Sequence, residues 1–354
     1  MGDLCRIQTL FLYSKKSVFY MPWRGKHPSY NIQEGAQTMK EITLCIGHGS
    51  RDGDGNEEFI RFVDKLREAA PDKHFEVSFL ELATPTILDG IDACVRAGAT
   101  RIVAVPIILL AASHTKLEIP EFLDAGRAKY PDVEIIYGRN IGLHERIVDL
   151  LTTRYQEHLL NLPTPVAEPE DTAIVLMGRG SSDPDANGDL YKIARQIWEH
   201  TGVHTVEVCF TGITFPSLSD GVRRAIALGA KQIVVVPYFL FTGVLIKRMR
   251  DVLATLQAEH PQVQMTMADY FGAHPYLVEV VLSRRDEAIA GHAFMNCDLC
   301  KYRKAALHDH HHHHDHAHAH AHAHHHHGDA HDHAHDHPHP HHHEANPTPV
   351  GEGA

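Results

Sequence analysis

Three polar residues stand at equal intervals in the N-terminal half of the chain: His48, Glu81 and His114, each 33 residues from the next. Two neutral imidazoles and a carboxylate can hold a divalent ion with open coordination positions, or they can accept protons and pass them on. Any one of the three alone is more simply explained as an ordinary loop residue, because His and Glu are common in loops. Their chemistry therefore depends on whether the fold brings them together.

Each of these residues ends or follows a short apolar run of the kind that forms a buried strand. The runs of this half lie at 42–46, 75–80, 101–106 and 133–137. Helical patterns separate them, and one of these places Phe59, Phe62, Val63 and Leu66 on one face. Strands that alternate with helices predict a parallel sheet buried on both faces, with ligands bound at the carboxyl edge of the strands. We therefore expect His48, Glu81 and His114 at that edge.

The sequence that begins at Ile42 is repeated 131 residues later. "ITLCIGHGSRDGDGN" at Ile42 recurs as "AIVLMGRGSSDPDAN" at Ala173, and "AGATRIVAVPIILLAASHTK" at Ala97 recurs as "LGAKQIVVVPYFLFTGVLIK" at Leu228. The runs of the second half lie at 173–177, 204–210, 232–237 and 263–268. The fold class predicted is α/β, with two duplicated Rossmann-like domains, each a four-stranded parallel sheet flanked by helices. The expected halves are 39–160 and 173–292, joined by a linker at 161–172.

The duplication also separates shared residues from unique ones. Gly47 and Gly49 recur in the second half, as a tight strand-to-helix turn requires. By contrast, His48 is matched by Arg179, Glu81 by Gly212 and His114 by Leu245. The loss of all three from one copy favours a function for the set over three unrelated loop residues.

The segments "CIGHGSR", "SFLEL" and "LLAASHTK", within a duplicated α/β chain, resemble the sirohydrochlorin chelatases of the class II chelatase group over about residues 40–305. "MNCDLCKYR" and the His-rich segment after it further resemble the long-form cobaltochelatases of anaerobic cobalamin synthesis. The resemblance implies a lyase that inserts Co²⁺ into sirohydrochlorin, held in a cleft between two domains, with release of two protons. It implies that His48 and His114 are the metal-binding catalytic pair, that Glu81 assists, and that each chain has one active centre.

An imidazole can bind a metal ion or accept a proton only while its ring is neutral. Activity is therefore expected to fall below pH ~6.5. The carboxylate arms of the macrocycle require cations at the rim of the site. The strand-end loops offer Arg51, Lys116, Arg179 and Lys247. Each could equally be a solvated charge, and Lys116 and Lys247 are repeat mates, which leaves a fold role open. His144 and His274, also repeat mates, are predicted to be structural residues at helix starts.

Cys297 and Cys300 form a Cys-x-x-Cys pair in the segment 293–304. Two thiolates at this spacing can chelate one metal ion or half a cluster. The resemblance implies a [4Fe–4S] cluster, and since two Cys cannot complete its ligation, we expect a homodimer that gives two from each chain. Cys45 and Cys209 lie within predicted strands and are expected in the core, and Cys94 reads as helical.

The segment 305–354 is rich in His: 22 of the 33 His of the chain lie between His308 and His343. The His alternate with Ala, Asp and Pro, unlike a purification tag, and the composition is typical of a disordered, solvated tail. Neutral imidazole binds Co, Ni, Cu and Zn, so we expect the tail to bind metal and to supply cobalt to the site.

Composition excludes several classes of protein. The net charge of −12 disfavours nucleic-acid binding, and the sequence has no apolar run of about 18 residues that could span a membrane. Six Cys in 354 residues indicate a reduced, cytoplasmic protein. Residues 1–38 lack periodicity and are expected to be a disordered or non-native leader, with Met39 as the natural start.

Two other functions remain open at this point. The same residues could insert iron into the same macrocycle, because His ligation does not separate Fe²⁺ sharply from Co²⁺ or Ni²⁺. Alternatively, the chain could be a cobalt or nickel chaperone or store, although storage does not require three ligands at the edge of a sheet.

Overall fold

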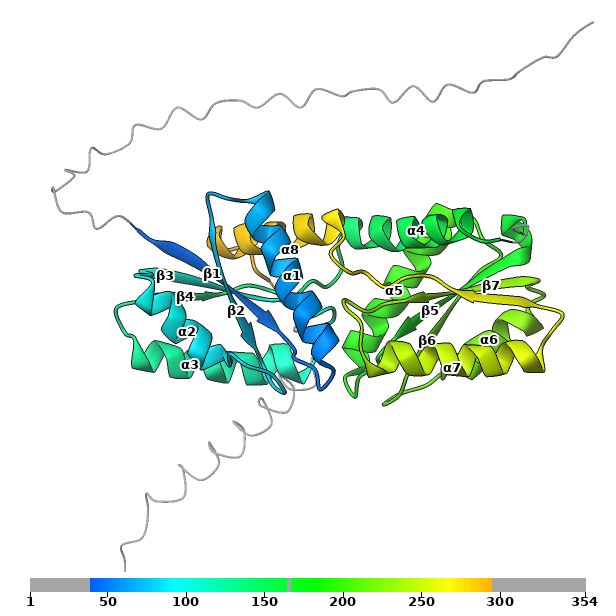
Figure 1. The fold of residues 1–354 in the computed structure, drawn as a ribbon, viewed down its shortest axis with the longest axis horizontal. Helices are drawn as coiled ribbons and strands as arrows, with labels where there is room; N and C mark the ends of the chain where they lie inside the picture. The colour runs from blue at the N-terminus through cyan, green and yellow to red at the C-terminus, as the bar shows by residue number, and fades with distance from the viewer. Residues whose placement is uncertain (1–38, 164–166, 295–354) are drawn as a thin grey trace, which may run out of the picture. The chain divides into compact units, whose positions relative to one another are not determined.

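The computed structural model describes residues 39–163 and 167–294. In each half, four parallel strands form a sheet in which the first strand is central (Figure 1). The first sheet has the order β2-β1-β3-β4 and the second the order β6-β5-β7-β8. The strands are β1 (Glu41–Gly47), β2 (His74–Phe79), β3 (Arg101–Pro106), β4 (Glu134–Tyr137), β5 (Thr172–Gly178), β6 (Thr205–Phe210), β7 (Gln232–Pro237) and β8 (Gln264–Met267). Each agrees with its predicted run to within one residue at either end, and the predicted fold class is confirmed.

The helices alternate with the strands, as the apolar periodicity predicted. They are α1 (Gly53–Ala69), α2 (Ile87–Arg96), α3 (Ile119–Lys129), α4 (Glu145–Leu160), α5 (Pro184–Thr201), α6 (Leu218–Ala227), α7 (Val244–Glu259) and α8 (Pro275–Ile289). A π-helical turn, η1 (His114–Glu118), leads into α3, and a short 3₁₀ turn, η2 (Pro169–Asp171), precedes β5. No helix among the described residues is long and apolar enough to cross a membrane.

The last helix of each half packs on the sheet of the other half. Helix α8 contacts α1, β3 and β4, whereas α4 contacts α5 and β7 (Figure 1). We call β1–β4 with α1, α2, α3 and α8 the first lobe, and β5–β8 with α4, α5, α6 and α7 the second lobe. The sequence repeat therefore does not coincide with the packed lobes, and both lobes belong to one compact unit.

The buried apolar side chains are distributed according to this exchange of α4 and α8. One cluster of buried side chains runs from the first sheet through the exchanged helices to the second sheet, and includes Phe62 of α1, Leu151 of α4 and Val281 of α8. Separate clusters lie under α2 and α3 and under α6 and α7. The four apolar residues predicted on one face of α1 are all buried. Because the largest cluster spans both lobes, hydrophobic burial holds the lobes together.

Two buried arginines anchor α8 to the first lobe. Arg284 is 1% exposed and donates to the backbone carbonyls of Ile141 and Leu143. Arg285 donates to the hydroxyl of Thr43 in β1. A buried guanidinium is tolerated only when its donors are satisfied, so these bonds fix the position of α8.

The chain crosses between the lobes at 138–144 and again at 268–274. In the first crossing, Ile141 and Gly142 donate their N–H groups to the carbonyls of Ile108 and Leu109, just after β3. In the second, Phe271 and Gly272 donate in the same way to residues 239 and 240, just after β7. Both crossings are thus hydrogen-bonded to the loops at the carboxyl ends of the strands.

Candidate active site

The fold brings the three predicted residues together. His48 follows β1, Glu81 lies two residues beyond β2, and His114 begins η1 after β3. Because β1 lies between β2 and β3, the three loops are neighbours. One potential ligand atom from each side chain lies within 4.8 Å of the others. The two imidazoles meet edge to face with ring centroids 4.7 Å apart, and His48 Nε2 is 3.7 Å from Glu81 Oε1.

A glycine permits this approach. Gly49 has a φ of +88°, and a Cβ atom at this position would lie 1.7 Å from the carbonyl oxygen of Glu81. The N–H of Glu81 in turn donates to the carbonyl of His48 over 3.1 Å. Only glycine adopts this backbone conformation without steric cost, so the loop after β1 can pass directly beneath the loop after β2. His48 and Glu81 become neighbours as a result.

Hydrogen bonding assigns the tautomer of His48. Its Nδ1 atom lies 3.0 Å from the carbonyl oxygen of Gly49, which can only accept, so Nδ1 carries the proton and Nε2 carries the lone pair. Burial lowers the pKa of His48, and the neighbouring guanidinium of Arg179 lowers it further. The hydrogen bond to the carbonyl of Gly49 raises the pKa and offsets part of this effect. The neutral ring therefore persists to lower pH than an exposed imidazole, which displaces the acid limit expected near pH 6.5 downward for this residue.

His114 has an acidic neighbour that sequence reasoning missed. Its buried Nδ1 atom lies 2.9 Å from Glu118 Oε1, although the two atoms are not aligned as a hydrogen bond. A carboxylate beside the outer nitrogen of a metal-binding imidazole makes the ring a more basic ligand, and it orients the ring when the two are hydrogen-bonded. Two features of the sequence could have identified Glu118. It stands four residues after His114, and its counterpart in the second half is Met249.

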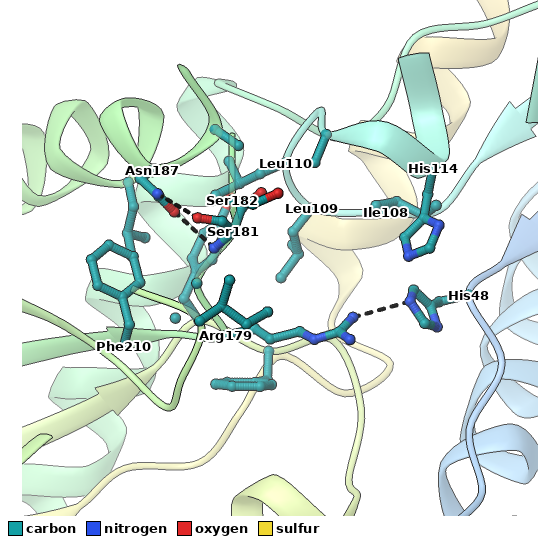
Figure 2. Close-up of a pocket in the computed structure, with 18 of the residues that line it drawn as sticks. His48, Ile108, Leu109, Leu110, His114, Arg179, Ser181, Ser182, Asn187 and Phe210 are labelled. Carbon is teal, nitrogen blue, oxygen red and sulfur yellow. Dashed lines mark hydrogen bonds between the residues drawn. The ribbon is translucent and has the colours of Figure 1, made fainter. Parts of the chain in front are cut away.

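A cavity of about 330 Å³ adjoins the two histidines and is lined by both lobes (Figure 2). Most of its wall is apolar, and Leu110, Phe210 and Tyr238 contribute to it. His48 and His114 lie at one end of the cavity, where Arg179 reaches His48, and Ser181, Ser182 and Asn187 lie on the side nearer Phe210 (Figure 2). Glu81 does not line the cavity and is half exposed, so it connects the histidines to solvent.

The two lysines of the strand-end loops tie the lobes together. Lys116 and Lys247 each donate to two carboxylates at the start of a helix in the opposite lobe. The pairs are Lys116 with Asp183 (2.8 Å) and Asp185 (3.2 Å), and Lys247 with Asp52 (2.9 Å) and Asp54 (3.3 Å). All six residues are repeat mates. Of the two alternatives left open for these lysines, the geometry favours the fold role.

The two arginines differ in position. Arg51 is exposed in the loop after β1. Arg179 extends from the second lobe towards the first, and its Nη1 atom lies 3.0 Å from His48 Nε2 (Figure 2). Of the four predicted rim cations, Arg179 is thus the one that contacts His48.

His144 and His274 are structural, as predicted. Each is the N-cap of the helix that follows, and its Nδ1 atom accepts the backbone N–H of the residue two positions on, Arg146 in α4 and Tyr276 in α8. Both histidines lie at the ends of the crossings. They therefore begin the two exchanged helices.

Cys45 and Cys209 are buried in the core as predicted, and Cys94 is helical as predicted and also buried. Burial raises the pKa of Cys45 in β1 and of Cys94 in α2 to about 12, and it raises that of Cys209 in β6 as well. These thiols are therefore poor metal ligands. The predictions for Cys297, Cys300, the leader 1–38 and the His-rich tail lie outside the described residues.

Known proteins resemble this chain over most of its length. The CbiX family model matches residues 42–158 and 173–288. The chain is 47% identical to the sirohydrochlorin cobaltochelatase of Priestia megaterium, over 76% of this chain and 86% of that protein. It is 37% identical to the sirohydrochlorin ferrochelatase of the same organism, over 68% of this chain and 88% of that protein.

Among solved structures, the sirohydrochlorin chelatase SirB from Bacillus subtilis subspecies spizizenii, in complex with cobalt, superimposes with a TM-score of 0.61. The two sequences are 33% identical, and the match covers 72% of this chain and 97% of that one. Both repeats of this chain fall within the family model, and the similarity to these proteins covers most of its length. The chain therefore belongs to the CbiX family.

Proposed function

We propose that this protein is a sirohydrochlorin chelatase and that Co²⁺ is the ion it inserts, for anaerobic cobalamin synthesis. The observation that carries the proposal is the set of two imidazoles and a carboxylate, of which the two imidazoles line a cavity between both lobes and the carboxylate lies beside them. Membership of the CbiX family and the similarity to a cobaltochelatase support it. The three residues are absent from the second repeat, which supports one active centre in each chain.

In this proposal, His48 and His114 receive the incoming ion. His48 offers the lone pair of Nε2, since Nδ1 is held by Gly49, and the negative charge of the Glu118 carboxylate lies beside Nδ1 of His114. Two neutral nitrogen ligands leave coordination positions open for the nitrogens of the macrocycle. The ion is a substrate, so ligands that hold it weakly enough to release it are required.

The rest of the site would serve the macrocycle. The apolar walls of the cavity offer contact to the faces of a flat ring, and Arg179 and Arg51 offer charge to its carboxylate arms. Insertion displaces two protons from the inner nitrogens. Glu81 is half exposed and lies beside His48, so it can accept a proton and release it to solvent.

The test is an anaerobic absorption assay with sirohydrochlorin and Co²⁺. We expect the spectrum of the metal-free macrocycle to convert to that of the cobalt product, and we expect His48→Ala and His114→Ala each to lower the rate by about 10² or more. His200→Ala is the matched control, because His200 is exposed on α5. Unchanged rates in both active-site variants would refute the assignment of the site.

Iron insertion is the second candidate, and the 37% identity to a ferrochelatase favours it. Rates with Co²⁺, Fe²⁺ and Ni²⁺, measured side by side at equal free-ion concentration, distinguish the two. A higher kcat/KM for Fe²⁺ would assign the protein to sirohaem synthesis. Tight metal binding with no change in the macrocycle spectrum would instead support a chaperone or store.

We further propose that Cys297 and Cys300 hold half of a [4Fe–4S] cluster that a homodimer completes. The Cys-x-x-Cys spacing supports this, and the three described cysteines are buried and unsuited to supply the missing ligands. Anaerobic reconstitution should yield about two iron atoms per chain, in a dimer whose cluster is lost in Cys297→Ala. A colourless, iron-free protein after reconstitution would exclude the cluster.

A further inference from the structure

Arg179 is hydrogen-bonded to Nε2 of His48, the atom that would bind the metal ion. Its Nη1 atom donates across the lobes to Nε2 over 3.0 Å, and the side chain lies along the cavity wall (Figure 2). Because Nδ1 of His48 is committed to the carbonyl of Gly49, Nε2 is the atom that must bind a metal ion. One lone pair cannot serve both a guanidinium and a cation, and the two positive charges also repel.

Arg179 is also the repeat mate of His48. The two residues stand at the same position after the first strand of each sheet, and the backbone carbonyl of Arg179 is held by the hydroxyl of Thr211. The second repeat has therefore lost the metal-binding imidazole and carries in its place a cation that reaches the remaining one. A substrate-binding role alone does not explain why the guanidinium points at His48.

We infer that Arg179 is a positioning residue that closes the metal site until the macrocycle arrives. Guanidinium pairs more strongly with a carboxylate than with a neutral imidazole, so an acid arm of the macrocycle in the cavity would draw Arg179 away from His48. Nε2 is then free to take the ion while the macrocycle is already in place. This inference rests on the proposed function and adds an order of events to it: the macrocycle binds first and opens the metal site.

The direct test is a titration with Co²⁺ alone, without macrocycle, followed by the paramagnetic shifts of the His48 and His114 ring signals so that binding at this site is measured apart from binding by the His-rich tail. A site that is closed most of the time binds with an apparent affinity reduced by its open fraction, so Arg179→Met should bind Co²⁺ about tenfold or more tightly than the unmodified protein. Arg250→Gln, which removes an exposed charge on α7 outside the cavity lining, should bind as the unmodified protein does. Thermal unfolding of each variant confirms that it is folded.

A double-mutant cycle separates this gate from a general charge effect. In a His48→Ala background the Arg179→Met substitution should leave Co²⁺ affinity unchanged, because the atom that Arg179 covers has been removed. With the macrocycle present, Arg179→Met should also raise the KM for sirohydrochlorin. Equal Co²⁺ affinity of Arg179→Met and the unmodified protein, or a gain that persists without His48, overturns the gate. If the unmodified protein does not insert metal into the macrocycle, the proposed function is wrong. The Co²⁺ titration would still show whether Arg179 competes with the ion for His48.

Discussion

At the scale of single residues, each side chain of the site lies against a neighbour that bears on its chemistry. Gly49 sets the tautomer of His48, Glu118 lies behind His114, and Glu81 joins both to solvent. The sequence could predict His48, Glu81 and His114 because the strand ends and the comparison of the repeats locate them. It could not predict that Arg179 points at His48, since that contact depends on how the two lobes pack.

Glu118 should matter to metal affinity although it is not among the three proposed site residues. Glu118→Gln removes the negative charge beside His114 Nδ1, and loss of such a partner lowers metal affinity by about 10- to 100-fold. Glu121→Gln, an exposed neighbour in α3, is the matched control and should have no effect. Co²⁺ titration measures both variants, and equal affinities would show that Glu118 does not support His114.

At the scale of elements, the exchanged helices begin at histidines that must stay neutral. An imidazole caps a helix only while Nδ1 has a free lone pair, and a positive charge at this end opposes the helix dipole. Burial is the largest cause that lowers the pKa of His144 and of His274, and nearby arginines, Arg284 and Arg154, lower these pKa values further. Both caps could be predicted from the sequence, because helix starts are local features.

The two histidine caps should make the free energy of unfolding depend on pH. In the unfolded chain these histidines take up protons near pH ~6.5, but the folded chain resists protonation until lower pH. The unfolded state therefore binds more protons in this interval, and the free energy of unfolding should fall as pH drops from about 6.5 through the folded pKa values. Urea unfolding across this range measures it. A double variant, His144→Asn and His274→Asn, should show a shallower dependence, and an unchanged slope would contradict the assignment.

The two lysine pairs provide a second prediction at this scale, with an internal control. Lys116 is 7% exposed and pairs with Asp183, which is fully buried, so Lys116→Met leaves a buried carboxylate without its cation and should cost about 3 kcal/mol of unfolding free energy. Lys247 makes the equivalent contacts but is 56% exposed, so Lys247→Met should cost clearly less. Denaturant unfolding compares them. Equal losses would mean that burial does not decide the strength of these pairs.

At the scale of the whole molecule, the exchange of α4 and α8 is the feature that the sequence could not predict. The apolar stripe of each helix shows that it packs on a sheet, but both sheets have similar buried surfaces, so the pattern does not identify the partner. The predicted limits 39–160 and 173–292 are the limits of the two sequence repeats, and as domain limits they remain a proposal. The folded lobes instead draw one helix each from the other repeat.

This exchange predicts the behaviour of an isolated repeat. Residues 39–160 would leave the surface of the first sheet that α8 covers exposed, and they would carry α4 without its sheet. Because α4 buries Ile147, Leu150 and Tyr155, we expect two copies to associate by placing each α4 on the other copy. Light scattering should report a dimer or aggregate, whereas a folded, stable monomer would show that α4 can return to its own sheet.

The two crossings between the lobes are hydrogen-bonded to the wall of the cavity. Their N–H groups are bonded to residues 108, 109, 239 and 240, and these same residues line the cavity beside the histidines. Rotation of one lobe against the other must bend both crossings together, and the bonded loops move with them. Any rotation of the lobes about these crossings would therefore change the width of the cavity and the separation of Arg179 from His48 together.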